Sequence, residues 1–155
     1  METGTRNRLE VSCTHFRLRQ LLRAVARLYD AEIGKAGLKG TQYSLLAHLA
    51  ALAPVQPAEL ARHLGMDAST LSRNLRPLLA AGWVTQLPGA DARSRQLRLT
   101  PEGEAKRREA RQHWRRAQKM LEERYGAEQV RALHGLIDDG LQRLSGPVLS
   151  EPARS

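Results

Sequence analysis

The sequence predicts a mainly α-helical fold that carries one small β-hairpin. Through most of the chain, apolar residues recur at steps of three and four, the periodicity of amphipathic helices. Between residues 83 and 100 the period changes to two, as it does in half-buried strands. The length of 155 residues fits one domain with one core. We therefore expect a single domain over residues 1–155.

The first helix is expected over residues 14–35, with Gly34 and Gly37 ending it. Its apolar face consists of Leu18, Leu21, Leu22, Val25, Leu28, Tyr29 and Ile33. A second helix follows over residues 41–52, and Thr41 is its expected N-cap. Both helices show an apolar face, the pattern of an amphipathic helix.

Two short helices with a tight turn between them are expected over residues 57–64 and 68–81. Pro57 suits a first helical turn, because its missing N–H is not needed there. Gly65 suits the left-handed position after a helix, and Gly82 suits the end of the next one. Asp67 is the expected N-cap of the second helix, and Pro77 inside that helix is expected to kink or loosen it.

Strands are expected over residues 83–87 and 96–100, and they form a hairpin with a long polar tip. Thr100 and Pro101 then begin a helix that runs to about Arg124, where Gly126 follows. A last helix is expected over residues 127–144. The order helix, turn, helix and hairpin is that of a winged helix-turn-helix.

The second helix of this motif is expected to enter the major groove of DNA. Small Ala61 allows close crossing of the two helices, and Leu71 packs back between them. The residues expected to contact DNA are Ser69, Thr70, Ser72, Arg73, Asn74 and Arg76. An alternative for Ser69 and Thr70 is that their hydroxyls only satisfy backbone groups in the first helical turn.

The hairpin tip carries a second set of expected DNA contacts. Arg93 and Arg95 alternate around Ser94, so both can point to the same side, into a minor groove or onto phosphates. Asp91 carries a negative charge and is expected to pair with Arg93 and shape the loop. The alternative is an exposed, ion-paired turn that binds no partner.

These motifs together resemble the multiple antibiotic resistance regulator (MarR) family of winged helix-turn-helix transcriptional regulators. The resemblance spans about residues 14–144 and rests on residues 60–70, 79–84, 91–95 and 99–103. It implies a cytoplasmic homodimer that binds a palindromic operator, usually as a repressor released by a small ligand or an oxidant. It also implies a DNA-binding part over residues 41–100 and a helical dimerisation part over residues 12–38 and 101–145.

The family resemblance also suggests two ways of sensing a signal. Cys13 and Tyr29 loosely resemble a redox pair of the organic hydroperoxide regulators, and Cys13 starts a helix whose dipole favours a thiolate. Phe16, Tyr43 and His48 are the expected lining of a cleft for a phenolic or carboxylate effector. For each of these three residues, ordinary packing in the core is the alternative.

Composition limits the remaining functions. The net charge of +9 favours a polyanion or a membrane surface as partner. No signal peptide or membrane span is expected, which leaves DNA or, as the alternative function, an acidic protein bound by the basic helices. One cysteine excludes a multi-cysteine metal site, and the histidines show no metal or catalytic spacing. We expect no enzyme activity, no catalytic residues, no metal and no cofactor.

Overall fold

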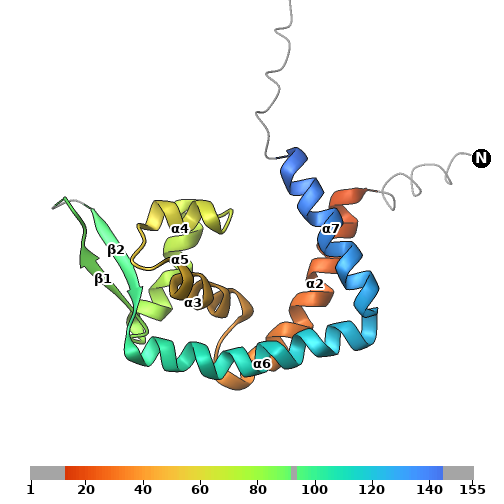
Figure 1. The fold of residues 1–155 in the computed structure, drawn as a ribbon, viewed down its shortest axis with the longest axis horizontal. Helices are drawn as coiled ribbons and strands as arrows, with labels where there is room; N and C mark the ends of the chain where they lie inside the picture. Colours follow the sequence, from red (N-terminus) through yellow and green to blue (C-terminus); the bar gives the residue numbers. More distant parts are fainter. Residues whose placement is uncertain (1–12, 92–93, 145–155) are drawn as a thin grey trace, which may run out of the picture. The chain divides into compact units, whose positions relative to one another are not determined.

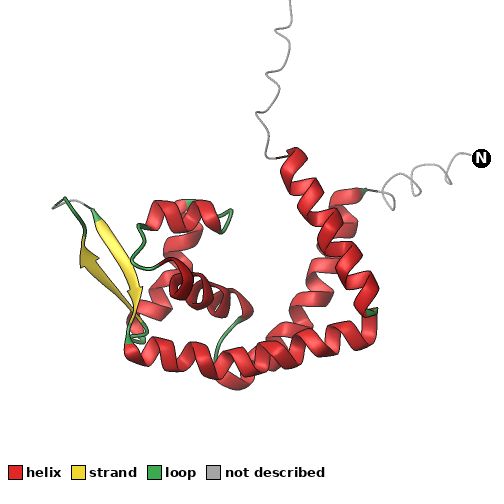
Figure 2. Cartoon of the chain, viewed as in Figure 1, coloured by secondary structure: helices red, strands yellow, loops and turns green. Residues whose placement is uncertain are grey.

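The computed structural model describes residues 13–91 and 94–144 of the chain, and it confirms the predicted fold class (Figures 1 and 2). The chain divides into two compact units, up to Ala117 and from Gln118 onward. The first unit contains α2 (Thr14–Ile33), the 3-10 helix η1 (Gly34–Ala36), α3 (Gly40–Leu52), α4 (Pro57–His63), α5 (Ala68–Ala80), β1 (Val84–Pro88), β2 (Arg95–Leu99) and the first part of α6 (Pro101–Tyr125). The second contains the end of α6 and α7 (Ala127–Leu144).

The core of the first unit is built mainly from leucines of α3, α4 and α5. Fully buried side chains are Ile33, Leu45, Leu46, Leu49, Val55, Leu60, Leu71, Leu78 and Leu97. Burying an aliphatic side chain of this size stabilises a fold by roughly 1.5–3 kcal/mol. This core joins the end of α2, the three central helices, the hairpin and Ala110 of α6, so it fixes α5 and the hairpin in one unit.

The expected apolar face of α2 is buried only at its C-terminal end. Ile33 is 1% exposed, whereas Leu18 is 56% and Leu22 is 67% exposed. The helix also ends at Ile33 and not at Lys35, because η1 forms the last turn before Gly37, whose φ is +73°. The N-terminal part of the predicted apolar face is therefore left exposed in the single chain.

The N-cap predicted for the second helix is also wrong. Lys39, not Thr41, is the N-cap of α3, and its N–H donates to Oε1 of Gln42 at 2.8 Å. The next N–H, of Gly40, donates to Oδ1 of Asp30 at 2.8 Å. A carboxylate from α2 thus satisfies a backbone group at the start of α3, a tertiary contact that local sequence does not encode.

Other predicted helix ends are confirmed. Pro57 lies in the first turn of α4, and Gly65 has a φ of +61°. α6 begins as expected, since the N–H of Gly103 donates to Oγ1 of Thr100 at 3.0 Å. α5 continues through Pro77 to Ala80.

The hairpin is antiparallel, and both of its strands lie one residue from their predicted positions. Val84 pairs with Leu99 at its base, and Pro88 pairs with Arg95 toward its tip. Val55 adds an isolated bridge to the hairpin, through N–H···O bonds of 2.8 and 3.2 Å exchanged with Leu97. This bridge was not predictable, because Val55 lies in a short segment between two prolines.

Candidate nucleic-acid interface

α4, a tight turn and α5 form the predicted helix-turn-helix. The N–H of Met66 donates to the carbonyl of Ala61 at 2.9 Å, which closes the end of α4 around Gly65. Ala61 and Leu71 are both buried. The small side chain and the leucine therefore lie where close packing of the two helices requires them.

Asp67 organises the start of α5. Its carboxylate accepts hydrogen bonds from the Ser69 hydroxyl at 2.6 Å, the Thr70 N–H at 2.7 Å and the Thr70 hydroxyl at 2.9 Å. These bonds hold the pKa of Asp67 far below its usual range, and the bond from the Ser69 hydroxyl has the largest effect. Both hydroxyl groups thus donate to the capping carboxylate and not to a backbone group, and their oxygens can still accept hydrogen bonds.

Replacing Asp67 with alanine is expected to lower the Tm by a few degrees at pH 7, because the N-cap bonds are lost. Since the pKa of Asp67 is depressed in the folded state, its stabilisation is complete above the ordinary pKa of aspartate, declines as pH falls below that value, and is lost only as pH passes the folded-state pKa. Calorimetry from pH 7 to pH 3 should show a difference in Tm between wild type and Asp67→Ala that is constant down to about pH 4 and smaller below it. Asp67→Asn is the control, since asparagine caps a helix without titrating. A difference in Tm that does not become smaller at low pH would contradict the role of the carboxylate.

The outward face of α5 is basic. Ser72, Arg73 and Arg76 are exposed, and Nη2 of Arg73 donates to Oγ1 of Thr70 at 3.4 Å. Among residues 13–91 and 94–144, no carboxylate forms an ion pair with either arginine. Their charges are therefore not neutralised by this part of the chain.

Asn74 differs from the other predicted contact residues of α5. It is half-buried, and its Nδ2 lies 3.9 Å from the sulfur of Met66. This geometry turns the amide toward the turn that precedes α5. Asn74 thus contacts the helix-turn-helix itself, unlike exposed Arg73 and Arg76.

Strands β1 and β2 of the hairpin project from the helices of the first unit (Figure 1). Arg95, at the start of β2, is exposed, and so is Arg98. Arg93 lies outside the described residues, and with it the predicted Asp91–Arg93 pair.

The residue that shapes the tip in the described part is Ser94, which the sequence reasoning missed. Its Oγ accepts the N–H of Asp91 at 3.1 Å, and its carbonyl accepts the N–H of Gly89 at 2.9 Å. The N–H of Ser94 also donates to the carbonyl of Asp91 at 3.0 Å. The preference of serine for such turns was the available signal.

Cys13 and Tyr29 are not brought together within the chain. Cys13 is exposed at the N-cap of α2, and its side chain makes no capping hydrogen bond. Tyr29 lies on the same helix, and at 1.5 Å per residue the two are roughly 24 Å apart along its axis. The distance excludes a direct bond between them in one chain.

A cavity of about 560 Å³ lies between α2, α3 and α6 of the first unit. Tyr43 and His48 line it as expected, together with Tyr29. Phe16 is absent from the lining and is 45% exposed near the start of α2. The sequence reasoning missed Trp114 as a lining residue, because its helical spacing indicated only a packed face.

The polar groups of this cavity are few and ordered. Nδ1 of His48 donates to the carbonyl of Ser44 at 2.7 Å, and Nε2 has no hydrogen-bond partner among the described residues. Burial raises the pKa of Tyr43 despite nearby arginines of α6, so its phenol stays neutral. Its ring lies 6.3 Å from that of Trp114, centroid to centroid. Apolar walls with few polar groups are typical of a small-molecule site.

Within the described ranges, no three His, Cys, Asp or Glu side chains come close enough to hold a metal ion. No helix in the same ranges has the length and hydrophobicity needed to cross a lipid bilayer.

Comparison with known proteins gives consistent results. A sequence model described as MarR family matches residues 36–94. An uncharacterised HTH-type transcriptional regulator, YwoH of Bacillus subtilis, is 30% identical over 89 residues, which are 57% of this chain and 65% of YwoH. The multiple antibiotic resistance protein MarR of Salmonella typhimurium is 32% identical over 80 residues, 51% of this chain and 56% of that protein. The chain thus spans less than two thirds of either relative.

Two solved structures are similar over most of the chain. The transcriptional regulator MosR of M. tuberculosis in complex with DNA is 28% identical with a TM-score of 0.77, covering 88% of this chain and all of that one. A MarR mutant of E. coli complexed with operator DNA is 25% identical with a TM-score of 0.77, covering 85% of this chain and 96% of that one. Family model, relatives and structures agree with the helix-turn-helix and hairpin described above, and the chain is similar to MarR-family regulators over this part.

Proposed function

We propose that this protein is a sequence-specific DNA-binding transcriptional regulator. The observation that carries the proposal is the exposed face of α5, where Arg73 and Arg76 have no carboxylate partner among the described residues. Arginine on such a helix can bind guanine through two hydrogen bonds in the major groove. The DNA complexes of M. tuberculosis MosR and of the E. coli MarR mutant support the same use of this fold.

We propose further that the regulator acts as a homodimer on a palindromic operator. In the first unit, α2 exposes Phe16, Leu18 and Leu22; in the second unit, α7 exposes Leu136, Ile137, Leu141 and Leu144. Helices with an exposed apolar face are stable in water when a partner covers that face. A second copy would supply this cover, with residues 12–38 and 101–145 forming the dimerisation part and 41–100 binding DNA. Two-fold symmetry would then match that of the operator.

We also propose that the protein is a repressor and that a signal releases it from DNA. The cavity lined by Tyr43, His48 and Trp114 is the proposed site of a phenolic or carboxylate effector. Its neutral phenol and free imidazole nitrogen can exchange hydrogen bonds with such a ligand. Oxidation of Cys13 is the second proposed signal, and the exposure of its thiol supports it.

Binding of duplex DNA tests the proposed function. Fluorescence anisotropy would compare a fragment of the gene's own promoter with random duplex of equal length, between 50 and 200 mM salt. We expect tighter binding to the promoter, with log K falling by about 0.9 per phosphate neutralised for each unit of log salt. Equal affinity for both duplexes would overturn the proposal. Binding of an acidic protein, with no preference among duplexes, would favour the alternative function in which the basic helices bind an acidic protein.

Peroxide is expected to weaken operator binding of the wild type about tenfold, a typical coupling between two sites. In this step the Cys13 thiolate is oxidised to a sulfenic acid, and the peroxide is reduced to water or an alcohol. Cys13→Ser, which keeps the size of the side chain, should bind the operator equally well with and without peroxide. An electrophoretic shift measured on both proteins checks this, and identical behaviour of the two would exclude the thiol switch.

A further inference from the structure

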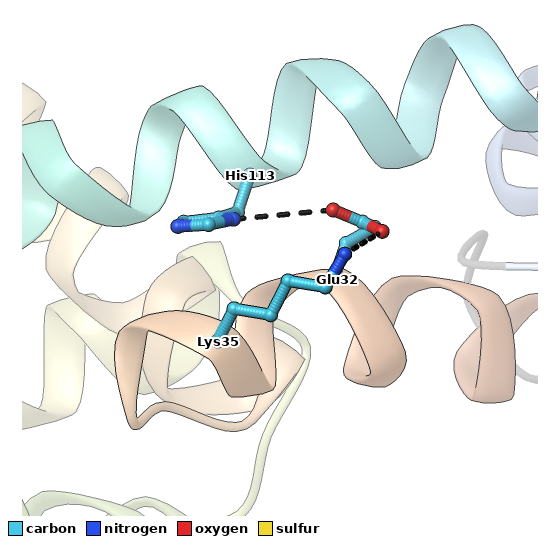
Figure 3. Close-up of polar contacts among 3 residues, drawn as sticks. All are labelled: Glu32, Lys35 and His113. Carbon is cyan, nitrogen blue, oxygen red and sulfur yellow. Dashed lines mark hydrogen bonds and ion pairs between the residues drawn. The ribbon is translucent and has the colours of Figure 1, made fainter.

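Two buried polar groups face each other between α2 and α6 (Figure 3). Glu32, near the end of α2, is 8% exposed, and the side chain of His113 on α6 is 17% exposed. Nδ1 of His113 lies 3.9 Å from Oε2 of Glu32. Both atoms are buried, and neither has a hydrogen-bond partner among the described residues. Buried polar atoms without partners are uncommon in folded proteins and point to a function or a second state.

Charged groups around the pair keep Glu32 ionised. Lys35 of η1 donates to Oε1, the other carboxylate oxygen (Figure 3). This bond, and then the charges of Lys35, His113 and Arg116, lower the pKa of Glu32 against the opposing effect of burial. Glu109, one turn before His113 on α6, is paired with Lys106 at 3.0 Å. Glu32 is therefore the carboxylate that faces the imidazole.

The charge of the imidazole decides how the two atoms interact. A neutral ring carries one N–H. If this proton is on Nε2, then Nδ1 of His113 and Oε2 of Glu32 are two acceptors that face each other. A protonated ring has an N–H on both nitrogens, and its bond to a carboxylate is short, about 2.7–2.9 Å, and about twice as strong as a neutral one. The separation of 3.9 Å leaves room for this closure by a small shift of either side chain.

We propose that Glu32 and His113 form a pH-controlled tie between α2 and α6, which closes when His113 is protonated. The next residue after each partner, Ile33 and Trp114, lines the cavity between these helices. Closing the tie holds the α2 and α6 walls of the cavity together. The use of the cavity for an effector rests on the proposed function, whereas the tie itself does not.

A double-mutant cycle on the full chain tests the tie. Urea unfolding would be measured at about pH 5.5 and pH 8, on either side of the usual histidine range, for wild type, Glu32→Gln, His113→Gln and the double variant. The coupling between the two positions is expressed as a factor in the folding equilibrium constant. This factor should be about tenfold larger at the lower pH, because a charge-assisted bond is then present. Stabilisation of this kind is gained as pH falls and lost as pH rises. Equal coupling at both pH values would overturn the proposal.

A second readout keeps the test independent of any variant that fails to fold. In the wild type, amides at the end of α2 should show several-fold greater protection at the lower pH, after correction for intrinsic exchange rates. Equal protection would contradict the tie. If pH-dependent coupling appears but no duplex is preferred, the tie stands and the regulator proposal fails.

Discussion

Replacing Arg73 with alanine is expected to remove most of the discrimination between operator and random DNA. One bidentate contact to guanine contributes roughly 1–3 kcal/mol of discrimination, about 5- to 150-fold in relative affinity. Arg73 is exposed on α5, is held by a bond to Thr70, and has no carboxylate partner among the described residues. Anisotropy titrations with operator and random duplexes would measure the ratio of affinities directly.

Two other arginines provide contrast for this experiment. Arg95, at the start of β2, is expected to contact the backbone, so Arg95→Ala should weaken operator and random DNA alike and lower the salt slope by about one. Arg131→Ala, on an exposed position of α7, should change neither affinity. If Arg73→Ala and Arg95→Ala both lowered the affinity for operator and random DNA by the same factor, this would contradict the assignment of base recognition to Arg73 and backbone contact to Arg95.

Gly103→Ala is expected to destabilise the fold by roughly 1–3 kcal/mol, the usual cost of overpacking. A Cβ at Gly103 would lie 1.9 Å from the carbonyl oxygen of Trp83 and 2.8 Å from its carbonyl carbon. Neither backbone atom can move freely, because the same carbonyl accepts the N–H of Thr100 at 3.0 Å, and the Thr100 hydroxyl donates to the carbonyl of Gly82 at 2.6 Å. Chemical unfolding of the variant would measure the loss.

Gly135, inside α7, is the matched control for this substitution. Among the described residues, and apart from its chain neighbours and the nearby backbone of α7, no atom lies within 4 Å of the position that its Cβ would occupy. Gly135→Ala should therefore stabilise the helix by up to about 1 kcal/mol, through the higher helix propensity of alanine. A loss at Gly103 no larger than any loss at Gly135 would show that the close approach to Trp83 is not under strain.

The fold was predictable where local chemistry decides the structure. Asp67 as an N-cap, Gly65 in a left-handed turn and Thr100 with Pro101 at the start of α6 each satisfy a backbone requirement that neighbouring residues create. Features that depend on distant segments were not predictable. Asp30 bonds the N–H of Gly40 from another helix, and Val55 joins the hairpin across more than forty residues of chain.

The candidate site was predictable to a similar extent. Helical periodicity places Arg73 and Arg76 outward, since Leu71, Leu75 and Leu78 must face the core. It does not say that Asn74 turns toward Met66. Helical periodicity also does not distinguish an apolar face that is packed within the chain from one that is left exposed. Leu18 and Ile33 lie on the same predicted face of α2, and of these two only Ile33 is buried.

The most direct test of the central claim is a footprint of the protein on the DNA upstream of its own gene. A homodimer that places α5 of each copy in a major groove should protect two symmetric half-sites, with centres about 10 base pairs or a multiple of that apart. Arg73→Ala should erase this pattern at concentrations where the wild type gives full protection. A single asymmetric protected segment, or protection that spreads evenly along the fragment, would contradict the account.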